Sequence, residues 1–218
     1  MNILSIMNLT KEYPGFTLDN VSFDVAKGTI MGFIGRNGAG KSTICKVIMG
    51  DSSYVNRGSV SYFGLDLKEN EREIKQRIGF TGGEVDYYKK KKIKDILTIT
   101  KRFYDDWDEE LCIKYMKMFS LDENKTPSEL SSGMKVKLNL VMALSHGAEL
   151  LILDEPTSGL DPMGREQILE LIKNYREQTG KTVIIVSHSM DDVARFATKV
   201  IVMNNSKVEM TGTVDEVF

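Results

Sequence analysis

One stretch of this 218-residue chain has the residue types and spacing of a phosphate-binding loop. It matches the pattern G-x-x-x-x-G-K-[ST] at every defined position, through Gly35, Arg36, Asn37, Gly38, Ala39, Gly40, Lys41, Ser42 and Thr43. Glycines in such a loop let backbone N–H groups converge on phosphate oxygens at a helix N-terminus, where the helix dipole favours an anion. Lys41 would reach the β- and γ-phosphates, and the Ser42 hydroxyl would bind Mg²⁺. The stretch therefore predicts a nucleotide site rather than a glycine-rich turn that caps a helix by chance.

Two acidic residues and a histidine follow apolar runs further along the chain. Asp154 and Glu155 close the run 150–153, and His188 ends the run 181–187. Ligands bind at the carboxyl ends of the strands in open α/β sheets, so these side chains should meet the phosphate loop. Asp154 could bind Mg²⁺, Glu155 could orient or deprotonate the water that attacks a γ-phosphate, and His188 could hydrogen-bond that phosphate. Each alone would be weak evidence, because a random histidine is more often a satisfied surface or core residue.

A second helix N-terminus has the residues of an anion site. Ser131 is a good N-cap, and the backbone N–H groups of Ser132 and Gly133 would point outward at a phosphate. Tyr13 lies on a turn about one strand upstream of the phosphate loop, where its ring could stack on an adenine or merely pack against its neighbours.

The elements that must position these residues predict an α/β fold. Apolar or β-prone runs predict strands at 3–9, 16–25, 29–34, 58–64, 77–80, 150–153, 181–187, 200–203 and 208–210. The first two strands should form a small antiparallel sheet and the last two a closing hairpin. The buried runs should form a mostly parallel core sheet, with a helix directly after the phosphate loop.

Residues 85–147 have helical periodicity and predict an inserted helical subdomain within a single domain, 1–218. The apolar faces of its first two helices are expected to carry Ile93, Ile96, Leu97 and Thr100, and Leu111, Tyr115, Met118 and Phe119, respectively. The acids of 105–110 supply N-cap candidates for the second helix. A third helix should begin after Ser131 and end near 146–147. It is preceded by Pro127 and would carry the second anion site.

The composition is that of an ordinary globular protein, with 41% hydrophobic and 28% charged residues. With a net charge of −2 and a pI near 5.8, the chain has no overall positive electrostatic field that would attract polyanions. Nucleic acid is therefore not an expected partner. Cys45 and Cys112 lie far apart in sequence and are expected to be packed thiols. The N-terminus lacks the features of a signal peptide, and no stretch approaches the roughly 18 apolar residues of a membrane span. These features predict a cytoplasmic chain.

Together the segments resemble the nucleotide-binding subunit of ATP-binding cassette (ABC) transporters over nearly the whole chain, in the family's motif order. The resemblance assigns 35–43 as the Walker A loop, 130–134 as the signature motif, 150–155 as the Walker B strand with its following acid, 158–161 as the D-loop, His188 as the switch histidine and Tyr13 as the adenine-stacking aromatic. It also implies that Asp161 of the D-loop belongs to the nucleotide site.

In functional terms, the resemblance implies an ATP hydrolase subunit that uses Mg²⁺ and dimerises head to tail around two ATP molecules. A second copy of this chain is the expected partner in that dimer. Separate integral membrane permease subunits would carry the substrate, so the chain would lie at the cytoplasmic face of the membrane, held there by those subunits. The segment 103–108 and the signature context look most like small bacterial efflux systems, which predicts export.

Two departures from the family pattern matter. The signature is commonly Leu-Ser-Gly-Gly-Gln, whereas this chain has Ser132 and Met134 in place of a glycine and the glutamine. Backbone N–H donation survives both changes. The loop after 78–80 usually carries a glutamine that contacts Mg²⁺, but here Gly83 occupies that place and Glu84 follows. Either Glu84 replaces the amide as a hard oxygen ligand of the metal, or the loop is a hinge and Glu84 stays solvated.

Two other functions would fit the phosphate loop alone. A soluble cassette ATPase could act as a mechanical clamp on DNA, ribosomes or an assembly scaffold, but most such proteins need coiled-coil insertions or duplicated cassettes, and this sequence has neither. A small-molecule phosphotransferase would leave the signature motif and the D-loop unexplained.

Overall fold

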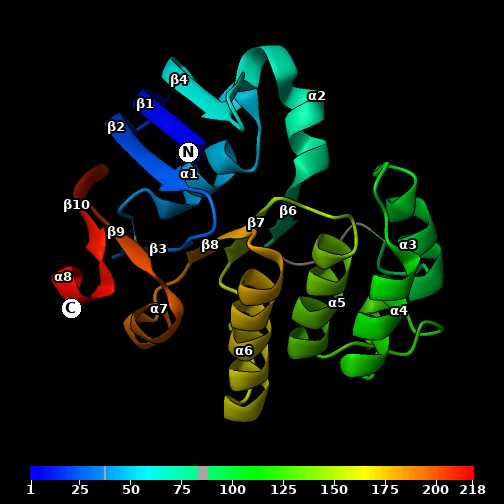
Figure 1. Ribbon diagram of the computed structural model, residues 1–218. Coiled ribbons are helices and arrows are strands. Elements are labelled where there is room, and N and C mark those ends of the chain that lie inside the picture. The colour runs from blue at the N-terminus through cyan, green and yellow to red at the C-terminus, as the bar shows by residue number, and fades with distance from the viewer. Residues whose placement is uncertain (37, 83–87) are drawn as a thin grey trace.

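The computed structural model describes residues 1–36, 38–82 and 88–218, which form two sheets with helices around them (Figure 1). The strands are β1 (Asn2–Tyr13), β2 (Phe16–Ala26), β3 (Ile30–Gly35), β4 (Arg57–Tyr62), β5 (Leu65–Asp66), β6 (Ile78–Thr81), β7 (Leu150–Asp154), β8 (Thr182–Val186), β9 (Lys199–Asn204) and β10 (Lys207–Thr213). The helices are α1 (Lys41–Ile48), α2 (Leu67–Arg77), α3 (Ile93–Lys101), α4 (Glu109–Met118), α5 (Ser132–Leu144), α6 (Pro162–Thr179), α7 (Met190–Phe196) and α8 (Val214–Val217), with short 3₁₀ turns at Ser52–Tyr54 and Pro127–Glu129.

The smaller sheet is antiparallel, with the strand order β2-β1-β4-β5. Its first hairpin closes where Tyr13 pairs with Phe16, across a turn in which Gly15 has a φ of 81°. Glycine adopts that left-handed conformation without a steric penalty, which explains the tight connection. The predicted antiparallel sheet is confirmed.

The core sheet has the order β10-β9-β3-β8-β7-β6, and only β10 among these strands pairs antiparallel. Alternate residues of β7 and β8 enter two different hydrophobic clusters. Leu150, Ile152, Ile184 and Val186 face α1 and the antiparallel sheet, and Leu151, Leu153, Val183 and Ile185 face α4, α5 and α6. Strands buried on both faces need continuous apolar runs, which is the pattern these segments have.

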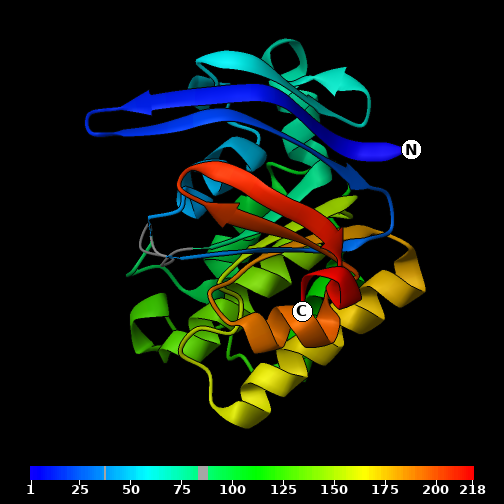
Figure 2. The same cartoon turned by 90° about the vertical axis from the view of Figure 1, so that its left-hand side faces the viewer.

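The layers are visible from two directions. The antiparallel sheet lies above the core sheet in both Figure 1 and Figure 2, and α6 lies below it. The helices α3 and α4 stand to one side, next to α5 (Figure 1). This arrangement leaves the carboxyl ends of β3, β7 and β8 together at one edge, because β8 pairs in parallel with both neighbours.

Two helices differ from the sequence analysis. Residues 67–77 form α2, for which no element was predicted, and its only buried residues are Leu67 and Ile74 among many charged ones. In α4, Met118 was expected on the apolar face but is 43% exposed. The buried stripe instead consists of Cys112, Tyr115, Met116 and Phe119, which recur at helical spacing.

The expected packed thiols and closing hairpin are confirmed. Cys45 and Cys112 are buried, free thiols, and burial raises the pKa of Cys112 to about 11. The hairpin of β9 and β10 closes where Asn204 pairs with Lys207. Within the described residues, no helix combines the length and apolarity that a membrane crossing requires.

Candidate nucleotide-binding site

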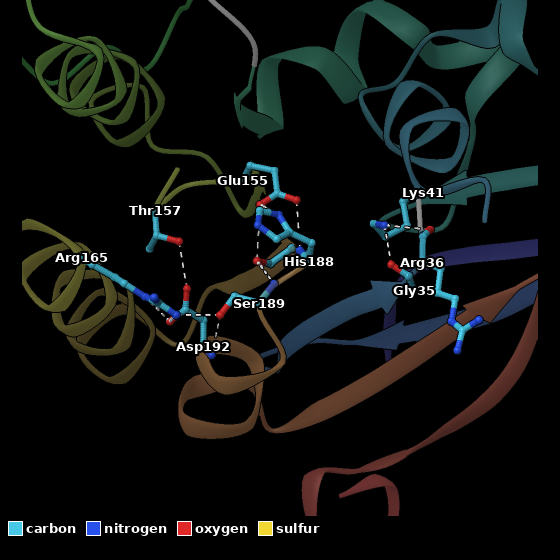
Figure 3. Close-up of polar contacts among 10 residues, drawn as sticks. Gly35, Arg36, Lys41, Glu155, Thr157, Arg165, His188, Ser189 and Asp192 are labelled. Atoms are coloured by element: carbon cyan, nitrogen blue, oxygen red, sulfur yellow. Dashed lines mark hydrogen bonds and ion pairs between the residues drawn. The ribbon is translucent and has the colours of Figure 1, made fainter. Parts of the chain in front are cut away.

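The phosphate loop joins the end of β3 to the start of α1. Gly38 and Gly40 have φ angles of 80° and 100°, so both positions use the left-handed conformations that glycine permits. The Lys41 ammonium donates to the carbonyl oxygens of Gly35 at 2.6 Å and Arg36 at 3.2 Å, and so lies across its own loop (Figure 3). Of the predicted loop residues, Asn37 lies outside the described part of the chain.

The loop and the predicted acids share one cleft of about 520 Å³. Its lining consists of Phe16, Gly38, Gly40, Lys41, Ser42, Thr43, Asp154, Glu155 and Val186. The structure therefore brings together the phosphate-binding residues and the strand-end carboxylates that the sequence placed on separate segments.

Ser42 and Asp154 offer a hydroxyl and a carboxylate to a hard cation such as Mg²⁺. Burial raises the pKa of the Asp154 carboxyl above its ordinary value, Glu155 raises it further, and Lys41 lowers it. The charged form of Asp154 is thus disfavoured by its surroundings, and a bound cation would relieve that penalty. Both residues therefore fit a metal bound together with a nucleotide. Glu84, the third predicted ligand, lies outside the described residues.

Glu155 and His188 contact each other directly. The Glu155 carboxylate accepts hydrogen bonds from the His188 backbone N–H at 3.0 Å and lies 2.8 Å from His188 Nδ1 (Figure 3). Glu155 has a φ of 50°, unusual for a residue with a side chain, and its N–H donates to Val186 O at 2.8 Å. The sequence placed these residues at two strand ends, but it did not predict their pairing.

The signature residues lie at the start of α5, where Ser131 accepts a hydrogen bond from Met134 N at 3.2 Å. The predicted N-cap is confirmed. Ser132 Oγ donates to Gly159 O at 3.4 Å, and a Cβ on Gly133 would lie 2.7 Å from Leu160 Cδ2. None of the signature residues belongs to the described lining of the phosphate-loop cleft. They pack instead on the D-loop of the same chain.

Asp161 and Tyr13 have structural contacts of their own. Asp161 caps α6 by accepting a hydrogen bond from Gly164 N at 2.9 Å. The Tyr13 hydroxyl is buried without a hydrogen-bond partner in the described part of the chain, and its ring lies 6.3 Å from that of Phe16. Phe16 lines the cleft, and the sequence reasoning missed it. The sequence feature that could have identified Phe16 is its position as a second aromatic residue, directly across the turn from Tyr13.

A polar cluster beside His188 was also missed. Asp192 is only 3% exposed, and its carboxylate accepts from Thr157 Oγ1 at 2.9 Å and from Arg165 Nε at 2.6 Å. Arg165 Nη2 also donates to Ser189 Oγ at 2.6 Å (Figure 3). We call Thr157, Arg165, Ser189 and Asp192 the Asp192 clasp.

Comparison with known proteins decides the family. The model of a family described as ABC transporter matches residues 18–158. The chain belongs to this family. An energy-coupling factor transporter ATP-binding protein, EcfA2 of Acetivibrio thermocellus, is 37% identical to this ABC domain over 214 residues, which cover 94% of the chain and 76% of EcfA2. The predicted family and its ligand, ATP, are confirmed.

Solved structures agree with the family assignment. An ATP-binding subunit of an ABC transporter matches 99% of this ABC domain with a TM-score of 0.88 and 26% identity, over 91% of its own length. The protein cbiO1 of Clostridium perfringens, described as part of the ABC transporter complex cbiONQ, matches all of this chain and 90% of its own with a TM-score of 0.83 and 25% identity. The predicted α/β cassette fold is confirmed. The efflux resemblance has no support from these proteins.

Proposed function

We propose that this ABC domain hydrolyses ATP as one half of a homodimer and powers transport through separate membrane subunits. One observation carries the proposal. The phosphate loop, Asp154, Glu155 and His188 gather at one edge of the sheet, whereas the signature helix of the same chain packs on its D-loop away from that cleft. A second chain, arranged head to tail, would supply the missing signature helix to each cleft. Two ATP molecules would then lie between the subunits.

Substrate binding rests on Lys41, Ser42 and Asp154. Lys41 exchanges the carbonyl oxygens it now contacts for oxygens of the β- and γ-phosphates. Ser42 and Asp154 would hold Mg²⁺, which supplies positive charge at those phosphates when bound. The uncapped N-terminus of α1 adds backbone N–H donors. Phe16 lines the cleft and could stack on the adenine, and the Tyr13 ring lies 6.3 Å from the Phe16 ring.

Hydrolysis rests on Glu155 and His188. The Glu155 carboxylate orients a water and accepts its proton as the water oxygen attacks the γ-phosphorus. The bond from the γ-phosphorus to the bridging oxygen breaks, and ADP leaves with that oxygen. Its oxygens now contact His188, so that contact must open before Glu155 can serve the water. The His188 side chain is 69% exposed and has room to turn toward the γ-phosphate. If His188 exchanged Glu155 for the γ-phosphate, the arrival of ATP would free the Glu155 carboxylate to act as the base.

The membrane subunits are inferred from the relatives. The description of cbiO1 as part of a transporter complex supports an assembly in which this chain binds membrane subunits and lies at the membrane surface through them. Export remains a prediction from the sequence resemblance alone. Purification of the native complex, with identification of any integral membrane chain, tests this part. A complex that holds DNA or ribosomes and no membrane chain would favour the mechanical clamp.

The hydrolytic role is tested with Glu155→Gln, and the exposed Glu170→Gln on α6 is the matched control. Steady-state phosphate release should fall by about 10²-fold or more in Glu155→Gln, since general base catalysis typically contributes that much. Its ATP affinity should match wild type, and light scattering should show a dimer only with ATP and Mg²⁺. Equal turnover in Glu155→Gln and wild type, or a dimer that is indifferent to nucleotide, would contradict the proposal.

A further inference from the structure

The Asp192 clasp ties together three segments that are far apart in sequence. Thr157 follows Glu155 by two positions, Arg165 lies in the first turns of α6, and Ser189 comes directly after His188. Thr157 and Arg165 donate hydrogen bonds to the almost fully buried carboxylate of Asp192. The Ser189 hydroxyl accepts hydrogen bonds from Arg165 Nη2 and from the Asp192 backbone N–H. Burying a charge is unfavourable unless it is paired and hydrogen-bonded, and both oxygens of Asp192 have such partners. The clasp is therefore a fully satisfied polar network.

The clasp is also linked to the contact between Glu155 and His188. Ser189 N donates to Ser187 Oγ at 3.0 Å, and that hydroxyl lies 3.5 Å from Glu155 Oε2. The side chains of Glu155 and His188 thus contact each other, while Thr157 and Ser189, which follow them in sequence, form hydrogen bonds with Asp192 (Figure 3). If the contact between Glu155 and His188 opened, the hydrogen bonds of the clasp would still hold the two segments together.

From this geometry we infer that Asp192 and Arg165 are positioning residues for hydrolysis. They set the placement of the His188 segment relative to the Glu155 segment through Ser189 and Thr157. The inference rests on the proposed function, because it assigns no chemistry to the clasp itself. Catalytic groups need tight placement, and an error of about 1 Å can cost about 10² in rate.

A purely structural reading is that the clasp only holds α6 against α7. The chain contains a matched control for that reading, since Arg195 of α7 and Glu166 of α6 form a second ion pair at 2.9 Å between the same helices. The side chains of Arg195 and Glu166 are 58% and 45% exposed, and neither residue belongs to the clasp. Glu166→Gln removes it without touching the clasp.

The test measures kcat, ATP affinity and thermal stability for Asp192→Asn and Thr157→Val, beside Glu166→Gln. Asp192→Asn keeps the shape and loses the charge, and Thr157→Val removes a single hydroxyl donor, so both should fold. We expect kcat to fall roughly ten- to hundredfold in the clasp variants with unchanged ATP affinity. Glu166→Gln should keep the wild-type kcat. Clasp variants with wild-type kcat, or with a kcat loss that Glu166→Gln reproduces, would overturn the inference.

A double-mutant cycle with His188→Ala separates positioning from loosening of the fold. If the clasp acts through His188, then Asp192→Asn should lower kcat much less in the His188→Ala background than in wild type. Fully additive losses would overturn the inference. The proposed function fails separately, by absence of ATP hydrolysis in wild type or by wild-type turnover in Glu155→Gln.

Discussion

Two helices of this chain begin at predicted phosphate sites, and their N-termini are built differently. The N-cap of α1 is Gly40, which offers no side-chain cap, whereas Ser131 caps α5 with its hydroxyl. The α1 terminus opens into a cleft that also holds Lys41, Asp154 and Glu155. The α5 terminus packs on the D-loop of its own chain. In the proposed function, the first would bind a phosphate and act on it, while the second would only bind one.

Because the two N-termini differ in this way, the phosphate-loop cleft of one chain includes the N-terminus of α1 but not that of α5. The groups around α1 hold one another in place, as the contacts of Lys41 and the pair of Glu155 and His188 show. The N-terminus of α5 has backbone donors without neighbouring catalytic groups. In the proposed dimer it would complete the cleft of the second subunit.

The largest effect is expected at α1. Lys41→Ala should weaken ATP binding by roughly 10- to 100-fold, because it removes charged hydrogen bonds to phosphate oxygens. Lys46→Ala, on the exposed side of the same helix, is the control and should bind as wild type does. Titration calorimetry with ATP and Mg²⁺ measures both. Wild-type ATP affinity in Lys41→Ala would contradict the role assigned to the N-terminus of α1 as the main phosphate-binding site.

At α5, Gly133→Asp should abolish the ATP-dependent dimer while each monomer still binds ATP. Two unit charges 4 Å apart repel by about 4 kcal/mol at an effective dielectric constant of 20, so an acid against the partner's phosphate is costly. Gly133→Ala is the control, because any Cβ here displaces Leu160. Light scattering with ATP and Mg²⁺, in the Glu155→Gln background, measures the fraction of dimer. A dimer formed by Gly133→Asp as readily as by its parent would break the assigned role of α5.

Glu84 is the next test, and it decides between the two readings of the loop that lacks a glutamine. A carboxylate that binds Mg²⁺ would be a hard oxygen ligand, so Glu84→Ala should need more Mg²⁺ for half-maximal turnover. ATP binding in EDTA should stay the same. Turnover is followed across a Mg²⁺ series. If the Mg²⁺ dependence of turnover is unchanged, Glu84 is not a metal ligand and the interpretation of the loop as a hinge is favoured.

The smallest effect is expected beyond the far end of α5, at His146. This side chain is 2% exposed, its ring nitrogens lie 3.1 Å from Met142 O and 3.0 Å from Ile78 O, and its ring stacks on Tyr104 at 3.9 Å. Burial lowers its pKa below the ordinary value of 6.5, against the opposing effect of the two carbonyl groups. The unfolded chain therefore binds this proton more tightly than the folded chain does.

The stability that His146 contributes is consequently complete above about pH 6.5 and is lost as the pH falls from there through the folded-state pKa. The melting temperature of wild type should drop more steeply below pH 6.5 than that of His146→Phe, which keeps an aromatic ring and cannot titrate. Thermal unfolding above and below this pH gives the two slopes. Parallel slopes would show that His146 does not titrate differently on folding. ATP binding at α1 should be the same in both proteins.

Much of the site was predictable because its signals are local. The left-handed turns at Gly38 and Gly40, and the side-chain caps at Ser131 and Asp161, depend on residues within a few positions of each other. The buried runs of β7 and β8 likewise indicate their own structure, since both faces of each strand are apolar. From such segments the sequence alone determined the cassette fold, the phosphate loop and the acids at the strand ends.

Only the tertiary structure decided which of these groups meet. Glu155 and His188 are 33 residues apart, and Thr157 and Asp192 are 35 apart. Each pair forms because β7 and β8 are neighbours in the sheet, and periodicity within a strand carries no information about the strand beside it. Phe16 reaches the cleft because the antiparallel sheet packs over α1, which is also a contact between segments distant in sequence. Contacts between distant segments depend on how whole layers dock, which is a property of the folded chain.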